Sequence, residues 1–394
     1  MLGLLASIAC AQQPRVLLDR DLGSTSVEIL ELTPQGVVFE DDIGRRRTIG
    51  WDRLAAFGAR PGTTARPAIP PGASGAVALI ETIDGQRLIG RLLASQGEGG
   101  EALAIDLGGL GTASVPLDEI SAIVLGAGRV LSGQLAREIG SRANPEDDFV
   151  ALTNGDGVSG FVLAMGESIE IETEAGDRTI PLSRVAGIGL ANARVSPEGP
   201  RVWLDDGSVL SIVPWLPAGG SLGLEQPEPM SLTADRVLAY APDAGALDAL
   251  AARPIARVLP DPTRRWTEMP AVGDVLATPL GAADISLPGP MAVDWRLQPE
   301  DARLAVTASL VRMLGGSPGP WADCVLRVEV VLSTGSVETL SSTRLTAGTP
   351  DATVSVELPG VGAGGRLLRL VLDAGEFGPV QDAVVLRGGL LGRD

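Results

Sequence analysis

The stretch that decides the fold runs from Phe149 to Leu190 and reads FVALTNGDGVSGFVLAMGESIEIETEAGDRTIPLSRVAGIGL. Its apolar segments are short, and turn-forming residues separate them at Asn154–Gly157 and again at Gly176-Asp177. Between these turns, Ser168–Glu172 alternates polar and apolar residues, which is the period of a strand with one buried face. Pro181 suits the start or the edge of a last strand. The stretch therefore predicts a small unit of short strands.

Weaker copies of this unit occur elsewhere in the chain. We expect β repeats at residues 15–58, 76–128, 149–192 and 200–241. Val115-Pro116-Leu117 in the second copy matches Ile180-Pro181-Leu182 in the third, whereas the fourth has Ser231 in place of the proline. A repeat of about 40–50 residues fits either small barrels or propeller blades. The Trp-Asp pair of a propeller blade occurs once, at Trp51-Asp52, so we favour tandem small barrels that resemble Sm-like or SH3-like barrels.

Two linkers and a different kind of domain complete the organisation. Residues 59–75 form a Pro/Gly linker, and residues 242–269 form a second linker in which Ala244–Ala252 is expected to be a short helix. Across residues 270–394 the alternating segments are longer, as in Cys324–Val328. The sequence therefore predicts an all-β protein, with tandem small β-barrel-like repeats followed by a C-terminal, jelly-roll-like β-sandwich.

The first residues are typical of an export signal. Met1–Ala11 is a short apolar run with small residues at alternate positions at its end, as at a secretory cleavage site. We expect residues 1–11 to be a signal peptide and the protein to be exported to the periplasm, the cell envelope or the outside. A first strand of the folded domain is the alternative, and Cys10 leaves a lipoprotein site open as another. No other stretch approaches the roughly 20 apolar residues of a membrane span, so no transmembrane segment is expected.

The charge and the residue types that the chain lacks exclude several functions. The net charge is −18, the chain contains no Lys and no His, and all 31 basic residues are Arg. Nucleic-acid binding relies on Lys and Arg that neutralise phosphates, so a nucleic-acid partner is not expected. The absence of His and Lys removes the commonest general base, the commonest zinc ligand and Schiff-base chemistry.

No motif in the sequence predicts catalysis, a metal site or a cofactor. Glu170 and Glu172 lie two residues apart on one strand, which is more typical of a solvated face than of the carboxyl pair of a glycosidase. Asn154-Gly155-Asp156 lacks the further oxygen ligands of a Ca²⁺ loop. Gly360–Gly365 fits a G-x-G-x-x-G pattern, but a strand pattern follows it where a nucleotide site needs a helix. We therefore expect a protein that is not an enzyme and carries no cofactor.

The last part of the chain resembles a known family. Trp295-Arg296-Leu297, Leu326-Arg327-Val328, Leu368–Asp373 and Gln381-Asp382-Ala383 occur in the order found in the NPCBM module, a carbohydrate-binding type of β-sandwich found near some glycoside hydrolases. The family's Gly-x-Gly-Val-His segment falls near Ile285–Pro290, where this chain has no His. The family's closing motif, Asp-Trp-Ala-Asp, is reduced in this chain to Gln381-Asp382-Ala383-Val384. Together with the repeats and the leader, the chain also resembles exported proteins of planctomycetes.

The resemblance implies that the sandwich recognises glycan or a cell-surface polymer. Trp295 and Trp321 are the aromatic platforms available for sugar stacking, with Asp373 nearby; the alternative is that both Trp side chains are core. A second hypothesis is a structural scaffold whose partners are envelope proteins, because two of the family's motifs are missing. A hydrolase that uses carboxylates alone is the least expected, and the oligomeric state is left open.

Overall fold

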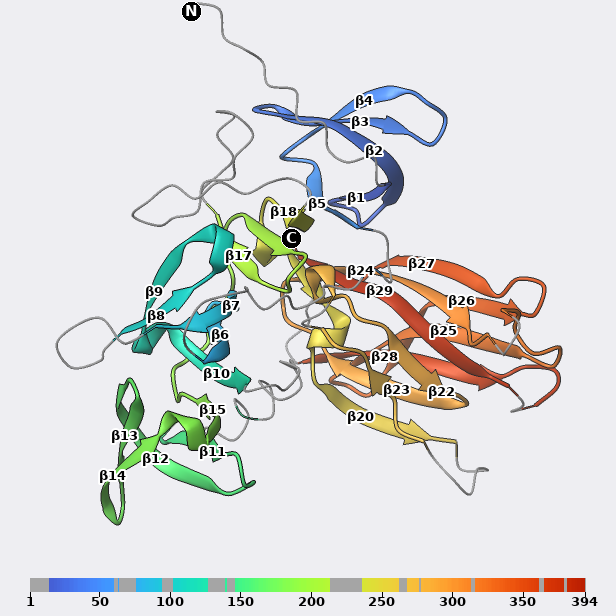
Figure 1. The fold of residues 1–394 in the computed structure, drawn as a ribbon. Coiled ribbons are helices and arrows are strands. Elements are labelled where there is room, and N and C mark those ends of the chain that lie inside the picture. The colour runs from blue at the N-terminus through green and yellow to red at the C-terminus, as the bar shows by residue number, and fades with distance from the viewer. Residues whose placement is uncertain are drawn as a thin grey trace, which may run out of the picture. The chain divides into compact units, whose positions relative to one another are not determined.

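Short strands and 3-10 turns make up the chain in the computed structural model (Figure 1). The structure describes residues 14–59, 63, 76–93, 102–126, 139, 146–212, 236–261, 268–275, 278–312, 316–360, 365–378 and 381–393. The expected signal peptide at residues 1–11 lies outside these residues, as does most of the linker at residues 59–75. The all-β fold class is confirmed, with barrel-like repeats followed by a sandwich.

The described residues fall into two compact units. One unit comprises those of segments 28–51 and 64–244, and the other comprises those of segments 14–27, 52–63 and 245–393.

The strands of the N-terminal part follow the repeats of the sequence. The first repeat contains β1 (Arg15–Asp19), β2 (Ser24–Thr33), β3 (Gly36–Asp41), β4 (Arg46–Gly50) and β5 (Leu54–Ala59). The second contains β6 (Val77–Thr82), β7 (Arg87–Leu92), β8 (Ala102–Asp106), β9 (Thr112–Pro116) and β10 (Ile120–Gly126), with 3-10 turns η1 (Gly108–Leu110) and η2 (Leu117–Glu119). The third contains β11 (Asp148–Leu152), β12 (Gly157–Met165), β13 (Ser168–Thr173), β14 (Gly176–Pro181), η3 (Leu182–Arg184) and β15 (Val185–Gly189). The described part of the fourth supplies β16 (Arg201–Leu204), β17 (Val209–Ser211) and β18 (Val237–Ala241).

Every repeat opens with the same tight turn. Gly85, Gly155 and Gly207 occupy its left-handed position, with φ of +81°, +92° and +90°, and each donates its N–H to the carbonyl three residues earlier at 3.0–3.1 Å. In the first repeat, Leu22 takes this position with φ of +61° and donates to the carbonyl of Asp19 at 3.0 Å. Glycine reaches this backbone conformation without the steric cost that a side chain adds, which explains its recurrence in three of the four turns.

Two further main-chain features recur in all four repeats. First, a backbone N–H in the tight turn, two positions before the residue with positive φ, donates a hydrogen bond across the repeat. The acceptor is the carbonyl of the residue just before the closing strand. These bonds are Arg20 to Arg53, Ile83 to Glu119, Thr153 to Arg184 and Asp205 to Arg236, at 2.8–3.1 Å. The first strand also pairs antiparallel with the closing strand, as β1 with β5, β6 with β10, β11 with β15 and β16 with β18. Each repeat is thus a small unit closed by its own first and last strands.

The second strand is shared between two pairings, and a glycine makes this possible. β7 pairs with both β6 and β8, and β12 pairs with both β11 and β13. A Cβ at Gly90 would lie 2.2 Å from the carbonyl oxygen of Asp106, and a Cβ at Gly160 would lie 2.1 Å from that of Glu172. Only glycine fits this close approach of two backbones.

Main-chain and buried polar contacts join the second, third and fourth repeats within the first unit. The closing strands β10 and β15 pair antiparallel, with Ile123 opposite Ile188. Between the second and fourth repeats, Arg201 donates to Asp84 at 2.7 Å, and Arg201 is only 4% exposed. Burial lowers the pKa of Arg201, although its ion pair with Asp84 works in the opposite direction. The second, third and fourth repeats therefore pack as one structural body and not as independent domains.

The C-terminal part of the second unit is a sandwich of two antiparallel sheets (Figure 1, yellow to red). One sheet has the order β21 (Ala271–Val272), β22 (Ile285–Pro288), β29 (Ala383–Arg393), β24 (Asp301–Leu310) and β27 (Asp351–Glu357), and β19 (Leu247–Ala249) also pairs with β29. The other has the order β20 (Ile255–Pro260), β23 (Met291–Arg296), β28 (Arg366–Ala374), β25 (Asp323–Leu332) and β26 (Val337–Thr346). Alternate residues such as Leu304, Val328 and Leu370 meet in a continuous apolar core.

The expected linker helix is wrong. Residues 244–252 form the 3-10 turn η5 (Ala244–Ala246), strand β19 and the 3-10 turn η6 (Leu250–Ala252). β19 pairs with Leu390–Gly392 of β29, and this pairing competes with the local bonds of a helix. Strand β20 follows directly, so residues 247–260 belong to the sandwich sheets rather than to a linker. A further 3-10 turn, η7 (Pro279–Gly281), precedes β22.

Candidate functional site

An exposed aromatic pair lies at one end of the β25–β28 strand pair. Trp321 precedes β25 and Phe377 follows β28, and the two strands are antiparallel with Cys324 opposite Ala374. The start of one strand therefore lies beside the end of the other. The rings meet edge to face, with centroids 5.5 Å apart and planes at 80°. Their side chains remain 54% and 49% exposed.

A buried aspartate fixes the backbone beneath this pair. Asp323 is 1% exposed, and its carboxylate accepts from Nε and Nη2 of Arg344 at 2.8 and 2.6 Å and from the N–H of Glu376 at 2.9 Å. The hydrogen bonds from Arg344 hold the pKa of Asp323 below its usual value, although burial works against them. Those same hydrogen bonds raise the pKa of Arg344. The loop that carries Phe377 is thereby tied to β25 and β26.

The polar groups beside the rings remain open to solvent on one side. Arg344 Nη2 also pairs with Glu376 Oε2 at 3.2 Å, and the two side chains are 53% and 73% exposed. We call Trp321, Phe377, Arg344 and Glu376 the aromatic end surface. It combines two apolar ring surfaces with a guanidinium and a carboxylate, so it can contact an apolar face and exchange hydrogen bonds at the rim.

The structure separates the two tryptophans that the sequence treats alike. Trp295 lies in β23 and is 0% exposed within the sandwich core, together with Met291 and Val293 of the same strand. Its Nε1 has no hydrogen-bond partner among the described residues. Trp295 is therefore a core side chain and presents no ring face to a ligand, whereas Trp321 does.

Asp373 lies on the outer face of the same sheet, engaged by a neighbour. Its backbone is opposite Val325 of β25, and its carboxylate pairs with Arg327. The Asp373 side chain is 42% exposed. It is therefore accessible, but its charge is already matched by Arg327.

Sequence reasoning missed Phe377, Arg344 and Glu376. Phe377 lies in a loop with no alternating pattern, and the contact with Trp321 depends on the pairing of strands that are about 50 residues apart in the chain. The one available signal was the rarity of aromatic residues, at 3% of the chain.

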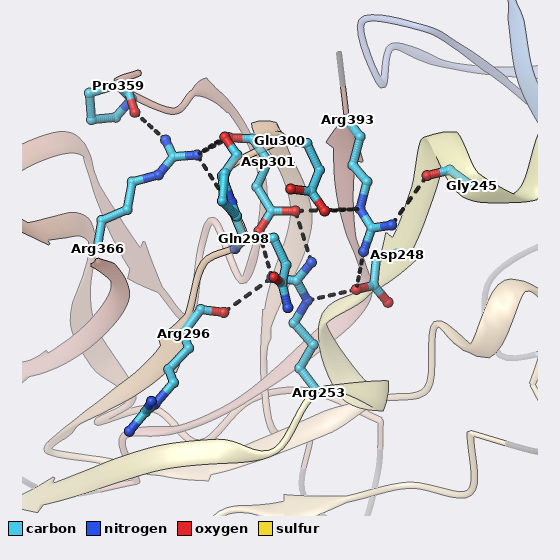
Figure 2. Close-up of polar contacts among 11 residues, drawn as sticks. Gly245, Asp248, Arg253, Arg296, Gln298, Glu300, Asp301, Pro359, Arg366 and Arg393 are labelled. Atoms are coloured by element: carbon cyan, nitrogen blue, oxygen red, sulfur yellow. Dashed lines mark hydrogen bonds and ion pairs between the residues drawn. The ribbon is translucent and has the colours of Figure 1, made fainter. Parts of the chain in front are cut away.

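A second polar cluster, at one edge of the sandwich, is largely buried and joined by ion pairs and hydrogen bonds (Figure 2). Arg253 donates to Asp301 at 2.5 and 2.8 Å and to Asp248 at 2.7 Å, and Asp301 also accepts from the N–H of Gln298 at 2.6 Å. Burial is the largest influence on the pKa of Arg253 and lowers it, but the hydrogen bonds and charges of Asp301 and Asp248 together outweigh burial, so the net shift is upward. Arg393 pairs with Asp248 at 3.2 Å.

Arg366 completes this cluster. Its guanidinium donates to the carbonyl oxygens of Pro359, Gln298, Pro299 and Asp301. Burial lowers the pKa of Arg366. We call Asp248, Arg253, Asp301, Arg366 and Arg393 the buried arginine cluster. Its charges bind one another and the backbone, so it holds β19, β24, β28 and β29 together rather than facing a ligand.

Three other features bear on the chemistry of the chain. Within the described residues, no group of three or more His, Cys, Asp or Glu side chains could hold a metal ion. Cys324 is free and buried, and burial raises the pKa of its thiol to about 12, with Asp382 and Asp323 adding to the shift. It behaves as a small core residue, as its strand position predicts. No helix in the described part of the chain is long and apolar enough to cross a membrane.

Comparison with known proteins gives structural likenesses only. No protein-family model matches the chain, and a search of the characterised proteins finds no match. A structure of CBM51-2 and INT domains from Clostridium perfringens ZmpB is 11% identical with a TM-score of 0.29, and the match covers 37% of this chain and 31% of that one. CBM51 from Clostridium perfringens GH95, in complex with methyl-galactose, is 16% identical with a TM-score of 0.26 over 37% of this chain and 99% of that one.

The tandem CBM51 modules of a family 98 glycoside hydrolase from Streptococcus pneumoniae SP3-BS71 are 11% identical with a TM-score of 0.28, over 81% of this chain and 88% of that one. These solved structures are carbohydrate-binding modules. At such TM-scores and identities, the likeness says nothing about a ligand of this chain.

Proposed function

We propose that the C-terminal sandwich binds carbohydrate through the aromatic end surface, and that the protein is a non-catalytic, exported binding protein. The observation that carries the proposal is the exposure of Trp321 and Phe377 side by side. Full burial of a large aromatic side chain is worth about 2–3 kcal/mol, so a ligand that covers these two exposed rings would gain binding free energy. Sugar rings present apolar C–H faces that can cover an aromatic ring.

The polar rim supports a ligand rich in hydroxyl groups. Arg344 contributes donors and Glu376 contributes acceptors directly beside the rings. Asp323 fixes the Arg344 side chain and the backbone of Glu376 through hydrogen bonds, and Arg344 in turn bonds the Glu376 carboxylate, so these groups are held in place before a ligand binds. Asp323 itself is buried and fully engaged, which favours a positioning role over acid–base catalysis.

The second candidate, a scaffold for envelope proteins, has its own supporting observation. The second, third and fourth repeats are joined by the β10–β15 pairing and by the buried Arg201–Asp84 pair. A rigid array of this kind suits a spacer or a platform for other proteins. Both candidates are proposed to act outside the cytoplasm, on the basis of the signal peptide that the sequence predicts at residues 1–11.

The test is an array of immobilised glycans and bacterial polysaccharides probed with the full-length chain and its variants. We expect Trp321→Ala and Phe377→Ala each to weaken binding at least 10-fold, because each removes one ring face. Val337→Ala is the matched control: Val337 is 50% exposed on β26 of the same sheet, so its loss should leave binding unchanged.

Binding that survives both aromatic substitutions would refute the assignment to this surface. If the folded wild-type chain is retained on no glycan, the carbohydrate proposal fails and the scaffold becomes the better candidate. Thermal unfolding of each variant separates a lost contact from a lost fold.

A further inference from the structure

The third repeat contains a groove that the carbohydrate proposal does not use. It is a cavity of about 590 Å³, and its lining comes from Asp147 just before β11, from β12, from the end of β13, from the β13–β14 turn and from β14. All of these segments belong to one repeat, so the groove is complete within that repeat.

The floor of the groove consists of small residues beside an exposed aromatic ring. Gly157, Ser159 and Gly160 of β12 line it, followed by Phe161, whose side chain is 54% exposed. Neither glycine can be replaced without a clash: a Cβ at Gly157 would lie 2.4 Å from the ring of Phe149, and one at Gly160 would lie 2.1 Å from a backbone oxygen. No side chain can therefore project into the groove from either glycine.

The rim is acidic and stands directly beside the aromatic ring. Asp147, Glu172 and Glu174 line the groove against a single basic residue, Arg178. Glu172 is the cross-strand partner of Phe161, so its carboxylate and the ring project from the same face of the sheet. An exposed ring and a carboxylate at adjacent positions form a site that suits a planar cation.

We propose that this groove binds an extended, arginine-bearing segment of another polypeptide. The guanidinium stacks on the ring of Phe161 and pairs with the carboxylate of Glu172, while Glu174 and Asp147 add attraction at the rim. Arginine fits better than lysine, because its planar head can stack and form two parallel hydrogen bonds to one carboxylate. Leu163, 51% exposed and two residues beyond Phe161 on β12, offers an apolar contact to a second side chain of the segment.

The charge of the whole chain makes a strict control necessary, because a net charge of −18 attracts any cationic peptide. The probes are two displayed libraries of linear nine-residue peptides, one with arginine and one with glutamine fixed at the central position. The full-length chain selects from both, and the enriched peptides are then measured by fluorescence anisotropy in 150 mM salt. We expect enrichment from the arginine library only.

The variants locate the binding. Phe161→Ala and Glu172→Gln should each weaken the selected peptides at least 10-fold. Glu167→Gln, a substitution of an exposed glutamate in the β12–β13 turn, should leave affinity unchanged although it removes the same charge. Citrulline in place of the central arginine should abolish binding.

Equal losses with Glu172→Gln and Glu167→Gln would mean non-specific attraction and would overturn the proposal. Enrichment from both libraries, or from neither, would overturn it as well. Trp321→Ala should not change peptide binding, so failure here and failure of the carbohydrate proposal can be told apart.

Discussion

A single carboxylate, that of Asp301, organises the buried arginine cluster. It is 1% exposed and receives three of the cluster's hydrogen bonds, two from Arg253 and one from the N–H of Gln298. Removing the charge of Asp301 leaves Asp248 as the carboxylate partner of the Arg253 side chain, and breaking a buried ion pair costs more than the pair itself contributes.

We therefore expect Asp301→Asn to lower the free energy of unfolding of the sandwich by about 3–5 kcal/mol. Asp351→Asn is the control, because Asp351 and its partner Arg312 are 45% and 49% exposed and such a pair is worth about 0–1 kcal/mol. Guanidinium unfolding, followed by circular dichroism, measures both. Equal effects of the two substitutions would show that the cluster does not hold this end of the sandwich.

At the residue scale, the sequence predicts which side chains are buried better than it predicts which side chains contact one another. The alternation in β23 already places Trp295 on the same face as Met291 and Val293, so its burial could be deduced from spacing alone. Trp321 lies outside any alternating segment, and its exposure and its contact with Phe377 follow from strand pairing that no local pattern encodes.

Among the elements, the second strands of the second and third repeats, β7 and β12, make the strictest demand on sequence. Gly90 and Gly160 both lie five residues after the turn glycine, at Gly85 and Gly155. In the fourth repeat, Ile212 stands at the corresponding distance from Gly207, and β17 ends at Ser211.

Two alanine substitutions compare a positive φ alone, at Gly155, with a positive φ and a backbone clash together, at Gly160. Gly160→Ala should lower the free energy of unfolding by about 3 kcal/mol, because its Cβ meets a backbone oxygen that cannot move without breaking the β12–β13 pairing, and its φ of +156° adds strain. Gly155→Ala, with nothing within 4 Å of its Cβ, should cost about 1–2 kcal/mol for its positive φ alone. Calorimetry of both variants tests this order, and a larger loss for Gly155→Ala would contradict it.

The elements were predictable where the pattern was local. Turn glycines, the closing Pro-Leu segments and the alternation of the sandwich strands all predicted real features. Residues 244–252 were misread because their composition favours a helix, whereas the exposed edge of β29 offers the backbone a pairing partner that only the folded sheet supplies.

At the scale of the whole molecule, the second and fourth repeats are joined by a buried polar contact that is not part of the repeated sequence motif. Arg201 reaches from the fourth repeat to the side chain and the carbonyl of Asp84 in the second, at 2.7 and 2.5 Å. The repeat pattern predicts neither residue as a contact, because the pair occurs once and is not part of the repeated motif.

We expect Asp84→Ala to weaken the contact between the second and fourth repeats, because the buried guanidinium of Arg201 loses its carboxylate partner. The free energy of unfolding should fall by about 3 kcal/mol. Hydrogen exchange should rise in both β7 and β17. Asp118→Ala, at an exposed aspartate in the same repeat, should leave exchange unchanged. Protection that persists in β17 of the Asp84 variant would show that the pair does not couple the repeats.

The pairing of first and closing strands has a mechanical consequence. In each repeat the chain enters and leaves at the same point, as Arg15 lies opposite Ala59 and Val77 opposite Gly126. A pulling force along the chain therefore loads these hydrogen bonds one at a time, as in a zipper, rather than all together in shear. The pairing of the first and closing strands of a repeat is therefore expected to open at a lower force than a pairing that is loaded in shear.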